Sequence, residues 1–127
     1  MLSDTFQTIL MKILNNLEID SNKLRHILEY IQTKPINSYV YPEVIESKLN
    51  ISISECMKIF VYLEKFGVLK QVYKLYCPQC KDFSYKIYED INDLEEENEC
   101  EICGKELVEE ENPYKYVVIY FRVISNG

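Results

Sequence analysis

The sequence is poor in several residue types on which catalysis commonly depends. Its 127 residues include no tryptophan, three glycines and one histidine. Three glycines do not supply the glycine-rich loop that cradles a nucleotide phosphate. No serine, cysteine or lysine has an evident base beside it, and His26 stands outside any triad or metal motif. We therefore expect a protein that is not an enzyme and has no small-molecule substrate.

Long apolar runs are missing as well. The chain is 47% hydrophobic, which is enough for a packed core. Its longest apolar segments are nevertheless much shorter than the roughly 20 residues that cross a membrane. Residues 1–10 lack the basic segment typical of a secretory leader. The sequence thus predicts a soluble, cytoplasmic protein without a membrane partner.

Positive charge is scarce in the second half of the chain. Residues 1–76 carry nine basic and eight acidic side chains, whereas residues 77–127 carry five and thirteen. Nucleic acids bind to clustered lysine and arginine, so the second half is expected to be poorly suited to DNA. The acidic stretch 89–99 is interpreted as a solvated loop, which is the usual role of a charge run.

Four cysteines are present in two closely spaced pairs. Cys77 and Cys80 form the first pair, Cys100 and Cys103 form the second, and nineteen residues separate them. Zinc favours four thiolates at the corners of a tetrahedron, and a two-residue gap lets one turn direct two sulfurs to one point. The pattern predicts one structural zinc ion, since four protein ligands leave no open position for water or substrate.

Other uses of these cysteines explain the pattern less well. Two disulfides would need an oxidising compartment, and a redox motif would account for only one of the pairs. An iron–sulfur cluster remains an alternative. The motifs Cys77-Pro78-Gln79-Cys80 and Cys100-Glu101-Ile102-Cys103-Gly104 resemble the two knuckles of a zinc ribbon. Gly104 suits the position after a knuckle because glycine accepts a positive φ.

Helical periodicity dominates the residues before the cysteines. We expect a helix capped by Asp4 and ending near Glu18, a helix capped by Ser21 or Asn22 and stopped before Pro35, a short helix starting at Pro42, and a helix over residues 53–66. Ser52 and Glu55 form a capping box before the last helix, and Gly67 suits its end. Cys56 lies on the inner face of that helix, so a buried thiol is expected there.

The order of these elements resembles a winged helix-turn-helix domain. The resemblance covers about residues 21–76, including an extended segment from Val68 to Tyr76, and it makes residues 53–66 the recognition helix. The predicted fold is α+β: a winged helix-turn-helix with an extra N-terminal helix over residues 1–76, fused to a small antiparallel β zinc ribbon over residues 77–127. In the ribbon we expect a strand from Phe83 through Tyr85 to Tyr88 and a long strand over residues 114–124.

This combination of domains is similar to the N-terminal region of the alpha subunit of the general transcription factor E. It also resembles small bacterial winged-helix/zinc-ribbon accessory proteins, including components of defence operons. The first resemblance implies docking on another protein rather than reading of a DNA sequence.

The outward face of residues 53–66 is apolar where a DNA-reading helix is usually polar. Ile53, Met57 and Val61 recur every four residues, with Tyr62 beside them, and the helix has neither arginine nor asparagine to read base edges. Either the first helix covers this stripe, or the stripe binds a partner. The main hypothesis is a non-enzymatic adaptor or accessory subunit of a multi-protein complex, such as a defence or transcription complex, that binds another protein through these four residues or the terminal strand.

Two alternatives remain open. One is a DNA-binding regulator whose contacts to phosphates and bases come from the polar side chains Ser54, Lys58, Lys65, Lys70 and Lys74. The other is a homodimeric scaffold in which a second copy of the chain covers the apolar surfaces.

Overall fold

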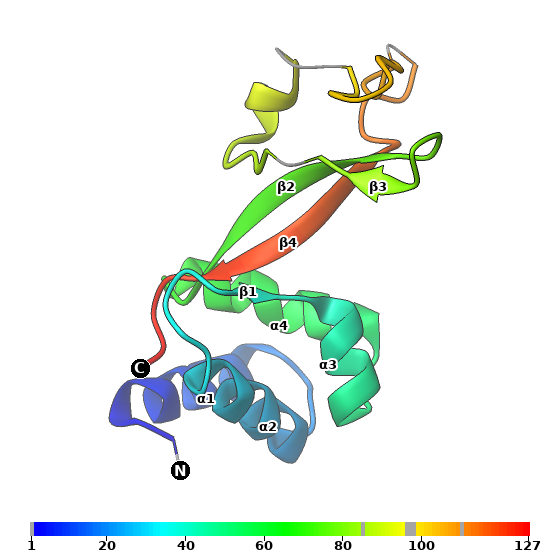
Figure 1. Ribbon diagram of the computed structural model, residues 1–127. Helices are drawn as coiled ribbons and strands as arrows, with labels where there is room; N and C mark the ends of the chain where they lie inside the picture. Colours follow the sequence, from blue (N-terminus) through cyan, green and yellow to red (C-terminus); the bar gives the residue numbers. More distant parts are fainter. Residues whose placement is uncertain (1, 85, 96–98, 110) are drawn as a thin grey trace. The chain divides into compact units, whose positions relative to one another are not determined.

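The computed structural model describes residues 2–84, 86–95, 99–109 and 111–127. Within these residues it contains four α-helices, one short 3-10 helix and a four-stranded antiparallel sheet (Figure 1). The chain forms two compact units: residues 1–70 with 121–127, here called the helical unit, and residues 71–120, here called the cysteine unit. The mixed α+β class expected from the sequence is confirmed.

The first two helices of the helical unit are α1, Asp4–Asn16, and α2, Ser21–Gln32. Ser3 caps α1, because its extended backbone lets the hydroxyl accept a hydrogen bond from the Phe6 N–H at 3.2 Å. Asp20 caps α2 by accepting from the Asn22 N–H at 2.7 Å. The expected caps, Asp4 and Ser21 or Asn22, were therefore wrong by one or two positions. Asp4 instead occupies the first turn, where its charge complements the helix dipole.

The next two helices, α3 at Pro42–Leu49 and α4 at Ile53–Lys65, are joined by a short turn. Pro42 begins α3 as predicted, since a first-turn residue needs no N–H partner. Asn50 adopts a left-handed conformation with φ of 55° and thereby ends α3. At the far end of α4, Gly67 has φ of 74°. The Gly67 and Val68 N–H groups donate to the Glu64 and Leu63 carbonyls, which is the Schellman pattern.

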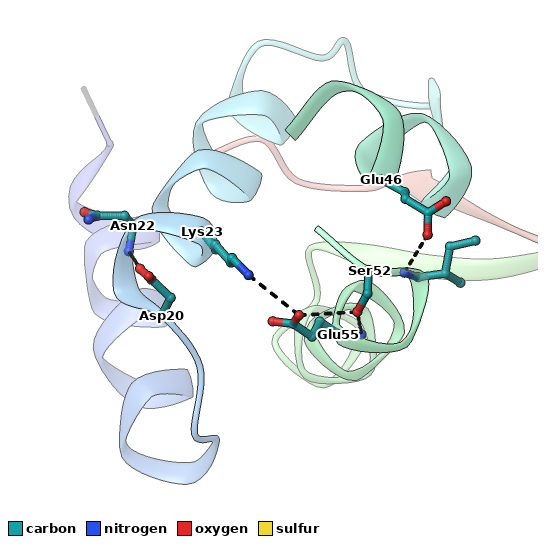
Figure 2. A network of polar contacts seen from close by, with 7 residues as sticks. Asp20, Asn22, Lys23, Glu46, Ser52 and Glu55 are labelled. Carbon is teal, nitrogen blue, oxygen red and sulfur yellow. Dashed lines mark hydrogen bonds and ion pairs between the residues drawn. The ribbon is translucent and has the colours of Figure 1, made fainter. Parts of the chain in front are cut away.

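A network of polar contacts fixes the start of α4 (Figure 2). The Ser52 hydroxyl accepts from the Glu55 N–H at 3.2 Å, and the Glu46 carboxylate of α3 accepts from the Ile53 N–H at 3.2 Å. Lys23 of α2 lies 3.7 Å from the Glu55 carboxylate. The predicted capping residue Ser52 is confirmed, and the same turn of α4 is tied to both α2 and α3.

One hydrophobic core holds the helical unit together. The T-shaped contact between Phe60 of α4 and Phe121 joins helices to sheet, with ring centroids 4.7 Å apart. Phe121 and Val123 belong to this core although they stand near the end of the chain. Strand β1, Tyr39–Val40, pairs antiparallel with the end of β4, Val117–Val123, and places Val40 opposite Phe121.

The strand order is β1-β4-β2-β3, where β2 is Leu69–Cys77 and β3 is Asp82–Phe83. The strand expected over residues 83–88 is shorter than predicted: β3 ends at Phe83, and Tyr88 forms only an isolated bridge with Tyr73. Tyr85, a member of that expected strand, lies outside the described residues. The 3-10 helix η1, Ile91–Glu95, occupies part of the acidic stretch, of which residues 96–98 are not described.

The core of the cysteine unit is much smaller than that of the helical unit. Within the described ranges it consists of five buried residues, Leu75, Cys77, Tyr88, Leu94 and Leu107. No helix in the described part of the chain is long and apolar enough to span a bilayer.

Candidate metal centre

Two similar turns present the four cysteines. Cys77 ends β2, and the turn that follows carries Cys80 just before β3. Cys100 and Cys103 occupy a second turn. The residue directly after each pair has a positive φ, 55° at Lys81 and 76° at Gly104. Glycine was expected at such a position, but Lys81 shows that the first turn has the same backbone shape without it.

The four sulfur atoms converge on one point, all within 4.8 Å of one another. Cys77 Sγ lies 3.6 Å from Cys103 Sγ, and Cys80 Sγ lies 3.9 Å from Cys100 Sγ. These distances are far longer than the roughly 2.05 Å of a disulfide bond. They are close to the edge of about 3.8 Å of a tetrahedron with metal–sulfur bonds of about 2.3 Å. The cluster is therefore consistent with a structural metal site.

Backbone amides point at the sulfurs and favour the charged form of one thiol. The N–H groups of Cys103 and Ile102 lower the pKa of Cys100 to about 6, because a thiolate accepts hydrogen bonds better than a thiol. The Cys80 N–H donates to Cys77 Sγ at 3.4 Å. A hydrogen bond with the Cys103 side chain raises the pKa of Cys80 to about 12. Cys80 and Cys100 thus hold their protons unequally.

The second turn is closed by its own backbone. The Gly104 N–H donates to the Cys100 carbonyl at 3.0 Å, and the Cys100 N–H donates to the Lys105 carbonyl at 2.8 Å. Glu99 and Glu106 pair as an antiparallel bridge across the base of the turn. These contacts were not predicted, because the sequence signals only the spacing of the cysteines and not the pairing beside them.

The fifth cysteine and the histidine lie apart from this cluster. Cys56 is fully buried in the core of the helical unit. Burial, and then the charge of Glu43, raises the pKa of its thiol to about 12. His26 is exposed on α2. The expectation of Cys56 as a buried thiol is confirmed.

The second candidate site is the outer face of α4. Ile53 and Val61 are 39% and 43% exposed, so neither is fully covered within the described residues. Met57 and Tyr62 are half-buried and pack against the helical core. The Lys65 ammonium lies 5.2 Å from the centre of the Tyr62 ring. Of these four residues, Ile53 and Val61 are therefore exposed, whereas Met57 and Tyr62 also support the fold.

The residues considered for DNA binding are divided between the two units. Ser54, Lys58 and Lys65 are exposed on α4. Lys70 and Lys74 are half-buried on β2 and belong to different units. Lys74 approaches the Tyr120 ring to 5.6 Å.

Comparisons of this chain with protein families, with curated proteins and with solved structures found no match.

Proposed function

We propose that this protein is a non-enzymatic, zinc-stabilised adaptor. In this proposal the four helices with β1 and β2 form a winged helix-turn-helix with an extra N-terminal helix, and the cysteine pairs form the knuckles of a zinc ribbon. The chain binds another protein through the outer face of α4. The exposure of Ile53 and Val61 on that face is the observation on which the proposal depends.

Zinc is the metal that best suits the four cysteines. Four thiolates in a tetrahedron are the ligand set of a structural zinc site, and the sulfur separations of 3.6 and 3.9 Å suit zinc–sulfur bonds. Cys77, Cys80, Cys100 and Cys103 would hold the ion and leave it no position for substrate. Bound zinc would cross-link the two turns and neutralise thiolate charge. Elemental analysis of the purified protein should find one zinc per chain.

The α4 face suits a protein partner with an apolar centre and acidic surroundings. Ile53 and Val61 supply exposed apolar area, which costs free energy in water unless a partner covers it. Lys58 and Lys65 are exposed on the same helix and would meet acidic side chains at the rim. A DNA groove would bring phosphates against Ile53 and Val61, which offer them no hydrogen bond.

The test is binding by variants of α4. The tagged protein is purified from its host, the captured protein is produced separately, and the affinity of the pair is measured by calorimetry. Val61→Asp should weaken binding at least tenfold, because it places a charge in a desolvated contact. Met11→Asp is the control, since Met11 is 58% exposed on α1 and its change should leave affinity unaltered.

Three results would reject the adaptor. Equal affinity of the Val61→Asp protein and the wild type would remove α4 from the interface. A dimer in light scattering that Val61→Asp converts to a monomer would favour the homodimeric scaffold. Tight, salt-sensitive binding of duplex DNA that Lys58→Ala weakens would favour the regulator.

A further inference from the structure

The cysteine unit has an aromatic hollow that the adaptor proposal does not use. Its volume is about 310 Å³. Six residues line it: Tyr76, Phe83, Lys115, Tyr116, Val117 and Val118. The hollow is formed where β2, β3 and the start of β4 meet, so its lining comes from three separate parts of the sequence. Its size is at the lower end of the range typical of ligand sites.

Three aromatic rings form a row beside this hollow. The Tyr76 and Phe83 ring centres are 5.1 Å apart, and the Phe83 and Tyr120 centres are 6.2 Å apart. Phe83 is 41% exposed at the end of the two-residue strand β3. A phenylalanine held in water at the edge of a hollow offers a π-face for stacking.

Two lysines lie beside aromatic rings of this region. Lys115 is exposed and lines the hollow, and its Nζ lies 5.3 Å from the ring centre of Tyr116, another lining residue. The Lys74 Nζ lies 5.6 Å from the ring centre of Tyr120, at one end of the aromatic row. Aromatic rings flanked by ammonium groups provide the two contacts that a single-stranded nucleic acid needs, stacking for its bases and positive charge for its phosphates.

We propose that this hollow binds a nucleotide of a single-stranded nucleic acid. One base stacks on the exposed Phe83 ring beside Tyr76, and the adjoining phosphates pair with Lys115 and Lys74. The charge of the unit limits the length of strand that is bound, because thirteen acidic against five basic side chains over residues 71–120 repel a long polyanion. The site therefore contacts about two phosphates. It is separate from the α4 face, so either proposal can fail without the other.

The test uses fluorescence anisotropy of the full-length, zinc-loaded protein with fluorescein-labelled oligothymidylate and oligouridylate. We expect saturable binding of at least one of them. The logarithm of the binding constant should fall with the logarithm of salt concentration with a slope of about −1.4, because each single-strand phosphate contributes about −0.7. Unlabelled thymidine or uridine monophosphate is the competitor. If the monophosphate displaces the labelled oligonucleotide at a concentration similar to that at which the oligonucleotide binds, the site is assigned to a free nucleotide. If much more monophosphate is needed, the site is assigned to a strand.

Variants separate stacking from folding. Phe83→Leu keeps an apolar side chain but removes the ring, and should weaken binding about tenfold, whereas Phe83→Trp should retain it. Lys115→Ala should weaken binding and make the salt slope less steep by about 0.7. The matched controls are Met11→Ala, an exposed apolar residue, and Lys86→Ala, an exposed cation of the same unit that does not line the hollow. Zinc content confirms that each variant is folded.

The proposal is overturned by three results. The first is no binding of either oligonucleotide at low salt. The second is binding that Phe83→Leu and Lys115→Ala leave unchanged. The third is tighter binding of an acidic peptide than of either oligonucleotide, with the same dependence on Phe83, which would make the hollow a peptide site.

Discussion

Removing the metal from the four cysteines should unfold the cysteine unit and leave the helical unit folded. The four buried apolar side chains of the small core, Leu75, Tyr88, Leu94 and Leu107, together contribute about 6–12 kcal/mol, at about 1.5–3 kcal/mol each. Structural zinc contributes about 10–16 kcal/mol in comparable small sites. A bound zinc ion would therefore supply about half or more of the free energy that holds this unit together. Among the described residues, the helical unit has a core of twenty buried residues, and none of the four clustered cysteines belongs to it.

Hydrogen exchange with mass spectrometry measures the two units separately. After a chelator is added, amides of β2 from Gln71 to Cys77 should lose their protection, while those of α2 and α4 keep theirs. Circular dichroism should retain the helical signal. Cys77→Ser should reproduce the effect of the chelator, and Cys56→Ala should retain zinc because Cys56 lies in the helical core. Full protection of β2 in the metal-free protein would refute the assignment of a structural metal.

Three further predictions concern the helical unit. Burial raises the pKa of the Cys56 thiol from 9.0 to about 12. The buried neutral thiol therefore contributes its full stabilisation below about pH 9 and loses it as the pH rises toward 12. Thermal unfolding measured across this pH range should depend less on pH in Cys56→Ala than in the wild type. Phe60→Ala removes the ring that packs on Phe121 and should lower the free energy of unfolding by about 3–5 kcal/mol in denaturant titrations. Ser52→Ala removes the cap of α4 and should cost about 1 kcal/mol, whereas Thr8→Ala, which loses an exposed hydroxyl contact within α1, should change stability by less than about 0.5 kcal/mol.

The local elements of this protein follow closely from its sequence. Helix α4 appears where Ser52, Glu55 and Gly67 predict it, because capping and termination depend on residues a few positions apart. The cysteine cluster was predicted for a similar reason, since each pair is brought together by one short turn. Helix starts were misplaced by one or two residues at Ser3 and Asp20, because neighbouring polar residues have similar capping preference and only the backbone conformation distinguishes them.

The aromatic hollow could not be predicted in this way. Phe83 was expected in a strand of six residues, but β3 is short and leaves its ring exposed. Tyr76, Phe83 and Lys115 have no common spacing that would indicate a shared site. They meet because β2, β3 and β4 are neighbours in the sheet.

The sequence alone determined the positions of the four helices, the four sulfur ligands and the uneven charge, since each depends on residue type and spacing over a few residues. Tertiary structure decided which apolar residues stay in water. It left Ile53 and Val61 exposed, and brought Phe121 and Val123 from the end of the chain into the helical core. The physical reason is that exposure depends on which segments pack together, and contacts between segments far apart along the chain have no signature in local periodicity.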